Sequence, residues 1–207
     1  MNASVWGAAI LAVAALEVIP AWAAAPLRAE DPDWPCQQRL VPQLVAASYW
    51  SAPLDAEGDW RADPEVAELV RRLTPRQVTT EEGLVAIAAF VRMASGDRRH
   101  HLALAFRGLL EETDRERGDL IARLRQMGHR QRELTDLVAR LGDELKSVPP
   151  EAADQRLDLQ QRHDFTARNF EEIQRTIRYA CEKPVALDAR LGAWARALQQ
   201  AANAAAG

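Results

Sequence analysis

The 207-residue sequence contains little glycine, proline and lysine, and these scarcities already exclude several classes of protein. Ten glycines and eleven prolines are too few for a collagen-like or loop-rich chain. Only Lys146 and Lys183 are lysines, so arginine supplies 24 of the 26 basic residues. The formal net charge of −4 does not suit a protein that binds nucleic acid by neutralising phosphates. We therefore expect no nucleic-acid partner, and we expect a folded chain because 48% of the residues are hydrophobic.

Motifs that carry catalysis or bind cofactors are also missing. The sequence has no Gly-x-Ser-x-Gly, no Ser-x-x-Lys and no glycine-rich phosphate loop. It has no Cys-x-x-Cys, no Cys-x-x-Cys-His and no His-Glu-x-x-His. The many carboxylates fall on helical faces expected to be exposed, where their pKa values should be ordinary. We predict that the protein is not an enzyme and that it has no cofactor.

The first segment has the layout of a secretory signal peptide. Residues 3–16 form an apolar run without a charge, and small residues follow, with Ala21-Trp22-Ala23 as the best cleavage site. Residues 1–23 are therefore predicted to be a cleavable signal, and the mature chain is predicted to be periplasmic or secreted. The amino-terminal region has no Lys or Arg, and Glu17 lies late in the run, so an uncleaved anchor is the alternative. After cleavage we expect no stable membrane insertion, because no other segment approaches 18 apolar residues.

The two cysteines, Cys36 and Cys181, agree with export. An even number of cysteines in an oxidising compartment indicates a disulfide bond. The bond would join the start of the mature chain to the end of a late helix. Two free thiols and a redox role are the alternatives, and the redox role lacks a Cys-x-x-Cys motif.

Residues 63–97 are predicted to form the short helices of a helical head. Asp63-Pro64 is typical of a helix start, with a carboxylate cap followed by proline in the first turn. Thr79 and Glu82 have the spacing of a capping box. The preceding residues 24–62 are rich in aromatic residues and proline, and we expect them to pack on this head.

Residues 98–183 are predicted to form a long antiparallel coiled-coil hairpin, so the fold class is all-α. Positions in alternating steps of four and three from Phe106 to Val148 form a seam in which ten of thirteen residues are apolar. A second seam runs from Leu159 to Ala180, and Pro149-Pro150 lies in the predicted turn at 147–151. Residues 184–207 are predicted to be a separate C-terminal helix that starts at Pro184 and ends in a frayed tail.

The best candidate for an interaction surface is the aromatic group before residue 62. It consists of Trp34, Tyr49, Trp50 and Trp60, and tryptophan and tyrosine are enriched among the residues that dominate protein–protein binding. The alternative is that these rings pack over the head beside the disulfide bond.

Histidines and a basic stretch supply weaker candidate sites. His100 and His101 are possible metal ligands, but neighbours on a helix point about 100° apart, so solvent exposure or capping is the alternative. The stretch from Ile121 to Arg132 contains no acidic residue. It could meet an anionic partner or lipid headgroups, or form a solvated helix face.

Three functions are consistent with this pattern. The first is an exported, non-enzymatic adaptor or scaffold of a cell-envelope complex that acts through protein–protein contacts, with a homodimer as a possible form. The second is a periplasmic module that binds a small ligand or a metal. The third is a holdase-like chaperone that clasps its clients between the helical arms.

Overall fold

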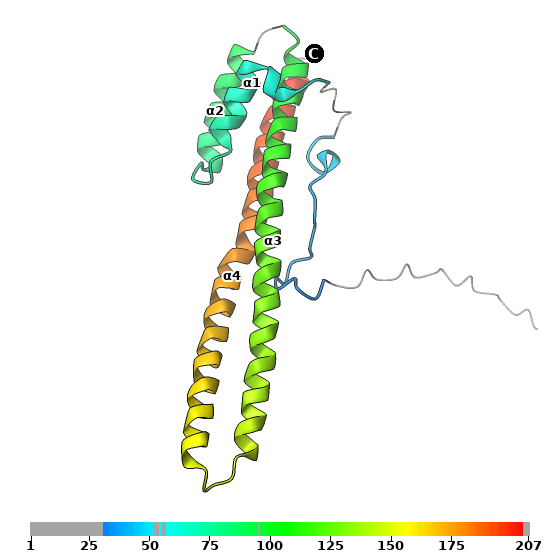
Figure 1. Cartoon of the computed structure of the whole chain (residues 1–207). Helices are drawn as coiled ribbons and strands as arrows, with labels where there is room; N and C mark the ends of the chain where they lie inside the picture. Colours follow the sequence, from blue (N-terminus) through cyan, green and yellow to red (C-terminus); the bar gives the residue numbers. More distant parts are fainter. Residues whose placement is uncertain (1–30, 52–53, 55–56, 95, 205–207) are drawn as a thin grey trace, which may run out of the picture. The chain divides into compact units, whose positions relative to one another are not determined.

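A computed structural model describes residues 31–51, 54, 57–94 and 96–204, and in these residues the regular secondary structure consists of helices, without a strand. The helices are α1 (Pro64–Leu73), α2 (Thr80–Met93), α3 (Arg98–Ser147) and α4 (Ala153–Ala204), with short 3₁₀ turns η1 (Ala46–Ser48) and η2 (Trp60–Ala62) before them. The long helices α3 and α4 are joined by a five-residue loop and run side by side in opposite directions (Figure 1). The predicted signal peptide lies outside the described residues.

Local side-chain caps explain where the helices begin. The Asp63 carboxylate accepts hydrogen bonds from the backbone N–H groups of Glu65 and Val66, both at 3.0 Å, and Pro64 occupies the first turn of α1. Thr79 and Glu82 form the predicted capping box at the start of α2. The helix starts at residues 64 and 80 therefore confirm the local patterns in the sequence.

Helix α4 corrects the prediction of a separate helix from Pro184. The helix continues through Pro184, which is itself buried. An internal proline costs about 3 kcal/mol because it removes one backbone hydrogen bond and crowds the preceding turn. The next turns bury Leu187, Leu191, Trp194 and Leu198, and each such side chain contributes about 1.5–3 kcal/mol, so packing outweighs the cost of the proline.

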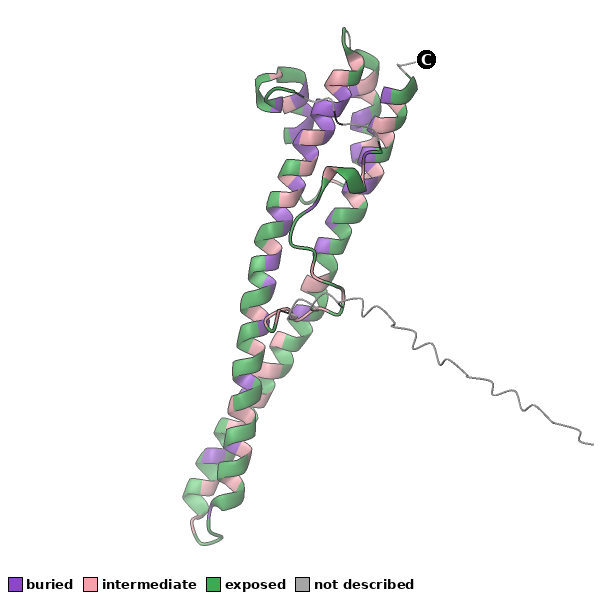
Figure 2. Cartoon of the chain, turned by 90° about the vertical axis from the view of Figure 1, so that its right-hand side faces the viewer, coloured by how far each residue is buried: buried purple, intermediate pink, exposed green. Residues whose placement is uncertain are grey.

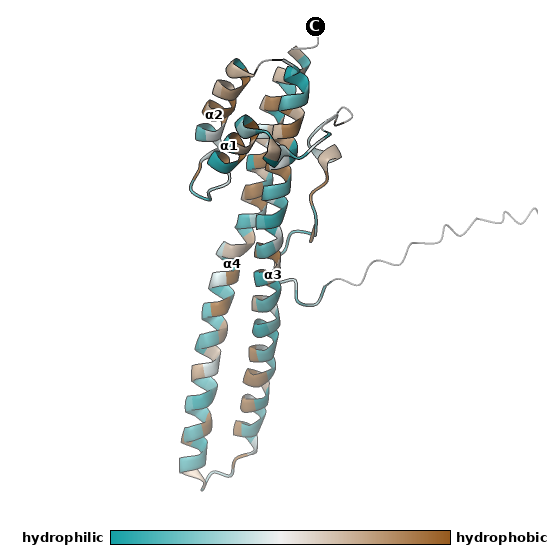
Figure 3. Ribbon diagram, turned by 45° about the horizontal axis from the view of Figure 1, so that its top comes forward, coloured by the Kyte–Doolittle hydropathy of each residue, from teal (hydrophilic) through white to brown (hydrophobic). Residues whose placement is uncertain are grey.

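The main hydrophobic core lies in the head, where α1 and α2 pack against the start of α3 and the end of α4 (Figure 3). Its fully buried side chains include Phe106, Leu102, Leu109, Trp194 and Leu198. Gly83 of α2 lies directly against the Trp194 ring, where a Cβ atom would come within 2.3 Å of it. The close approach of α2 to α4 therefore depends on a residue without a side chain.

We call residues 121–180 the stalk, and they bury far less than the head does (Figure 2). A second small core near the loop consists of Leu141, Val148 and Leu159. All seam positions predicted on both arms are buried or partly buried. None of the helices in residues 31–51, 54, 57–94 and 96–204 has an apolar stretch that could cross a lipid bilayer.

Residues 31–51, which we call the strap, lie along the hairpin (Figure 1). Cys36 and Cys181 are at disulfide distance, with their Cα atoms 5.6 Å apart. Next to this bridge the Gln38 amide donates to the Cys181 carbonyl oxygen at 2.6 Å. Further along, the Leu44 N–H donates to the Asp114 carboxylate at 2.6 Å. The strap is thus attached to both long helices.

Candidate functional site

The predicted aromatic surface is wrong for Trp50 and Trp60, because both rings belong to the core. Each residue is 6% exposed. The Trp50 ring stacks on Phe106 with centroids 5.0 Å apart, and the Trp60 Nε1–H donates to Glu111 at 2.7 Å. These rings anchor the segment before α1 to α3, and neither presents a face to a partner.

Trp34 and Tyr49 are half-buried and also make contacts within the chain. The Trp34 Nε1–H donates to the Gln38 carbonyl oxygen at 2.7 Å. The Tyr49 hydroxyl donates to the Asp188 carboxylate of α4, and burial, followed by this hydrogen bond, raises the pKa of the hydroxyl above its ordinary value of 10.0. Tyr49, Trp50 and Trp60 therefore fasten the strap and η2 to the hairpin, whereas the hydrogen bond of Trp34 stays within the strap.

The two candidate metal ligands, His100 and His101, have divergent rings. Their ring planes are 69° apart. His101 Nε2 lies 3.1 Å from the Asp63 carboxylate, and its Nδ1 lies 3.1 Å from the Asp97 carbonyl oxygen. Within the described part of the chain, no group of three His, Cys, Asp or Glu residues is arranged to hold a metal ion. His101 instead links the caps of α1 and α3.

Part of the acid-free stretch of α3 is neutralised by the chain itself. Arg125 pairs with Asp31 at 2.5 Å, and Asp33 pairs with both Arg132 and His129. The two aspartates come from the strap, which crosses α3 here. Sequence reasoning found the basic stretch and missed its anionic partner, because the two are about 95 residues apart in the chain.

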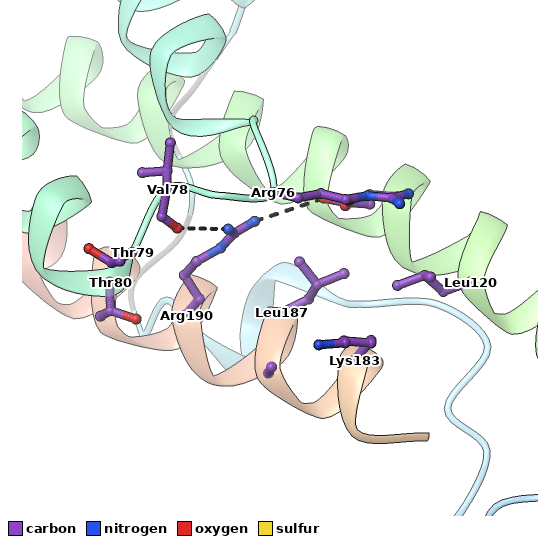
Figure 4. A pocket seen from close by; sticks show the side chains of 10 residues that line it. Arg76, Val78, Thr79, Thr80, Leu120, Lys183, Leu187 and Arg190 are labelled. Atoms are coloured by element: carbon purple, nitrogen blue, oxygen red, sulfur yellow. Dashed lines mark hydrogen bonds and ion pairs between the residues drawn. The ribbon is translucent and has the colours of Figure 1, made fainter. Parts of the chain in front are cut away.

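The structure also contains a cavity of about 390 Å³ between the α1–α2 connection, α3 and α4, which we call the junction cavity (Figure 4). Its charged lining consists of Arg76, Glu116, Lys183 and Arg190. Val78, Leu120 and Leu187 contribute apolar surface. Three cations thus surround one carboxylate in a chain whose formal net charge is −4.

Arg190 is the most deeply placed cation of this cavity. Its side chain is 11% exposed; Nη1 donates to the Val78 carbonyl oxygen at 3.0 Å, and Nη2 lies 3.8 Å from Glu116. Burial lowers the pKa of Arg190, and the charge of Glu116 offsets only part of that effect. Glu116 is more closely bonded to Arg76, whose Nε donates to it at 2.6 Å. The Arg190 guanidinium is therefore desolvated, with Glu116 as its ion-pair partner at 3.8 Å and its Cζ atom 4.9 Å from the centroid of the Trp194 ring.

Sequence reasoning missed this cavity, although a local signal was present. Arg190 lies three residues after Leu187 and four before Trp194, so it falls on the apolar face of its helix. Glu116 has the same relation to the seam positions Thr113 and Leu120. A charge on an apolar face indicates a buried ion pair or a site, but the partner on another helix is not visible in the pattern.

The outer face of the stalk forms a second candidate surface. Leu157, Phe165 and Tyr179 of α4 are 57%, 61% and 69% exposed. At about 100° per residue they fall within about 80° of one another, on the opposite side of the helix from the buried Leu159 and Ile177. The signal was again present, because these residues lie off the predicted seam.

Comparison of the chain with protein-family models, curated proteins and solved structures finds no match.

Proposed function

We propose that the protein is an exported, non-enzymatic helical protein that acts through protein–protein contacts as an adaptor or scaffold in the cell envelope. The observation that carries this proposal is the outer face of α4, where three large apolar side chains are exposed on one side of a long helix. The partner that this face suits is an amphipathic helix of another envelope protein.

The chemistry of this face supports a helical partner. Phe165 and Tyr179 offer large ring surfaces of the kind that dominates binding energy at interfaces. Arg168 and Glu172 are exposed between them on the same face and offer charges of both signs. A partner helix with an apolar stripe and flanking charges would cover the two rings and form ion pairs with Arg168 and Glu172.

The arrangement of the stalk supports a coiled coil as the element that presents this face. The four-three spacing of the seam runs along both arms, and no seam residue is exposed. Polar seam residues such as Thr113 and Thr166 are buried, and we propose that they fix the register of the two arms. A two-helix stalk with a thin core would serve as a docking rod and not as an enclosed active site.

Two observations support export. The Cys36–Cys181 pair is at disulfide distance, and disulfide bonds persist mainly in oxidising compartments. The apolar run of residues 3–16 and the small residues after it suit a secretory signal. We therefore place the proposed function in the periplasm or outside the cell.

The experiment is site-specific photo-cross-linking of the full-length protein in its native cells, with a photoreactive residue at position 165. The matched control places the same residue at Gln160, which is exposed on a different side of α4. We expect one dominant envelope protein to be cross-linked from position 165 and not from position 160. Phe165→Gln together with Leu157→Gln should abolish the cross-link formed from position 161 on the same face.

Equal cross-linking from positions 165 and 160 would refute this face as the interface. A cross-link to a second copy of the chain alone would make the face a homodimer interface and would overturn the adaptor function. Both glutamine substitutions replace exposed side chains, so the unfolding free energy, measured by thermal unfolding, should stay within about 0.5 kcal/mol of the wild-type value.

A further inference from the structure

We propose that the junction cavity binds a small organic anion, with a carboxylate head held by Arg190 and Lys183 and a short apolar body against Val78, Leu120 and Leu187. This site is separate from the outer face of α4 and does not depend on the proposed adaptor function. The charges, the lining and the size of the cavity each contribute to the inference.

The charged side chains that line the cavity have a net positive charge, which favours an anionic ligand. Arg76, Lys183 and Arg190 contribute three positive charges and Glu116 one negative charge. Glu116 is bonded to Arg76 at 2.6 Å, whereas its distance to Arg190 is 3.8 Å. Lys183 makes no ion pair with any residue that the structure describes. The lining therefore keeps a net positive charge, carried by Lys183 and by Arg190, whose charge Glu116 at 3.8 Å and the Trp194 ring at 4.9 Å compensate only in part.

Arg190 is well suited to hold a carboxylate. A guanidinium has five N–H donors, and among the described residues Arg190 uses one of them in a hydrogen bond, to the Val78 carbonyl oxygen. Its side chain is 89% buried, so water compensates the charge poorly. A ligand carboxylate could accept two parallel hydrogen bonds from it, which are stronger than bonds between neutral groups.

The remaining lining selects an organic anion over an inorganic one. Lys183, Leu187 and Arg190 lie at spacings of four and three, so they share one face of α4 and project toward the cavity (Figure 4). Val78 and Leu120 bring apolar surface from the α1–α2 connection and from α3. A volume of about 390 Å³ lies within the range of small-molecule sites. A bare inorganic ion would leave the apolar part of the lining uncovered.

The test is isothermal titration of the full chain with hexanoate, with 1-hexanol and inorganic phosphate as comparison probes. We expect saturable binding of hexanoate, no binding of 1-hexanol and weaker binding of phosphate. The variants are Lys183→Met and its matched control Lys146→Met, which removes the only other lysine at the far end of α3. Lys183→Met should weaken hexanoate binding about tenfold or more, and Lys146→Met should leave it unchanged.

A second pair of variants tests the position of the site without removing a charge. Ala186 lines the cavity and is exposed, whereas Ala189 is exposed on α4 and is not part of the lining. Ala186→Phe should abolish hexanoate binding, and Ala189→Phe should not. The proposal is overturned if wild-type protein binds no hexanoate at millimolar concentration, if 1-hexanol or phosphate binds as well as hexanoate, or if both members of either variant pair behave alike.

Discussion

Gly128 of α3 tests whether the strap is held firmly against the stalk. A Cβ atom at this position would lie 2.1 Å from the Asp33 carbonyl oxygen and 3.2 Å from Pro35. No real Cβ contact is as short as 2.1 Å, so Gly128→Ala requires the strap or the helix to move. The strap cannot move freely there, because the Cys36–Cys181 bridge lies three residues beyond Asp33, and Asp33 itself forms an ion pair with Arg132 and a hydrogen bond with His129.

Two opposing effects determine how far Gly128→Ala changes the unfolding free energy. Replacing glycine by alanine inside a helix stabilises the fold by about 1 kcal/mol, and overpacking costs about 1–3 kcal/mol. Gly142→Ala is the matched control, because it lies in the same helix and its added methyl group would meet nothing within 4 Å. We expect Gly142→Ala to stabilise the protein by about 1 kcal/mol and Gly128→Ala to be about 1–3 kcal/mol less stable than that control.

The assay is urea unfolding followed by circular dichroism at 222 nm, with and without a reducing agent. Under reducing conditions the strap is released from Cys181 and can move aside, so the difference between the Gly128 and Gly142 variants should shrink. The reasoning is refuted if Gly128→Ala is as stable as Gly142→Ala under oxidising conditions. A difference that persists fully after reduction would show that the disulfide bond does not hold the strap in place.

Two further predictions concern the attachment of the strap. Replacing Cys36 and Cys181 together by alanine should lower the unfolding free energy by up to about 5 kcal/mol, the chain-entropy value for a crosslink that spans 145 positions, and reducing agent should then have no further effect in urea unfolding. Tyr49→Phe should change the pH dependence of stability. Because folding raises the pKa of this hydroxyl, its stabilising contribution is complete below about pH 10 and is lost as the pH rises further. The unfolding free energy of the wild type should therefore fall faster between pH 9 and 11 than that of the variant. Equal changes of unfolding free energy with pH, measured by urea unfolding, would contradict this.

The helices could be predicted because their signals are local. The Asp63 cap, the capping box from Thr79 to Glu82 and the four-three spacing of the seam all lie within a few residues of the structure that they specify. The prediction that a new helix starts at Pro184 is wrong because it relied on a local signal as well. In the structure, the packing of the turns after Pro184 outweighs the local cost of the proline. Burial of apolar side chains against other helices therefore overrides the helix-breaking preference of a single residue in α4.

The junction cavity and the seat of the strap on α3 depend on contacts that no local pattern encodes. Arg190 meets Glu116 across about 75 residues, and the strap meets Gly128 across about 95. Trp50 and Trp60 could be recognised as aromatic residues that need a partner, but only the fold shows that this partner is the chain's own core. The residue type therefore predicts that a side chain will make contacts, and the tertiary structure determines which partner it contacts.

The covalent bridge between the strap and α4 also determines how the protein carries mechanical load. Tension applied between residue 31 and residue 204 passes from Cys36 directly to Cys181, because the bond is the shorter path. The segment between the two cysteines, which contains α1, α2, α3 and the whole stalk, then lies outside the covalent load path. Reduction would place that segment in the load path and add about 500 Å of extensible chain at about 3.5 Å per residue.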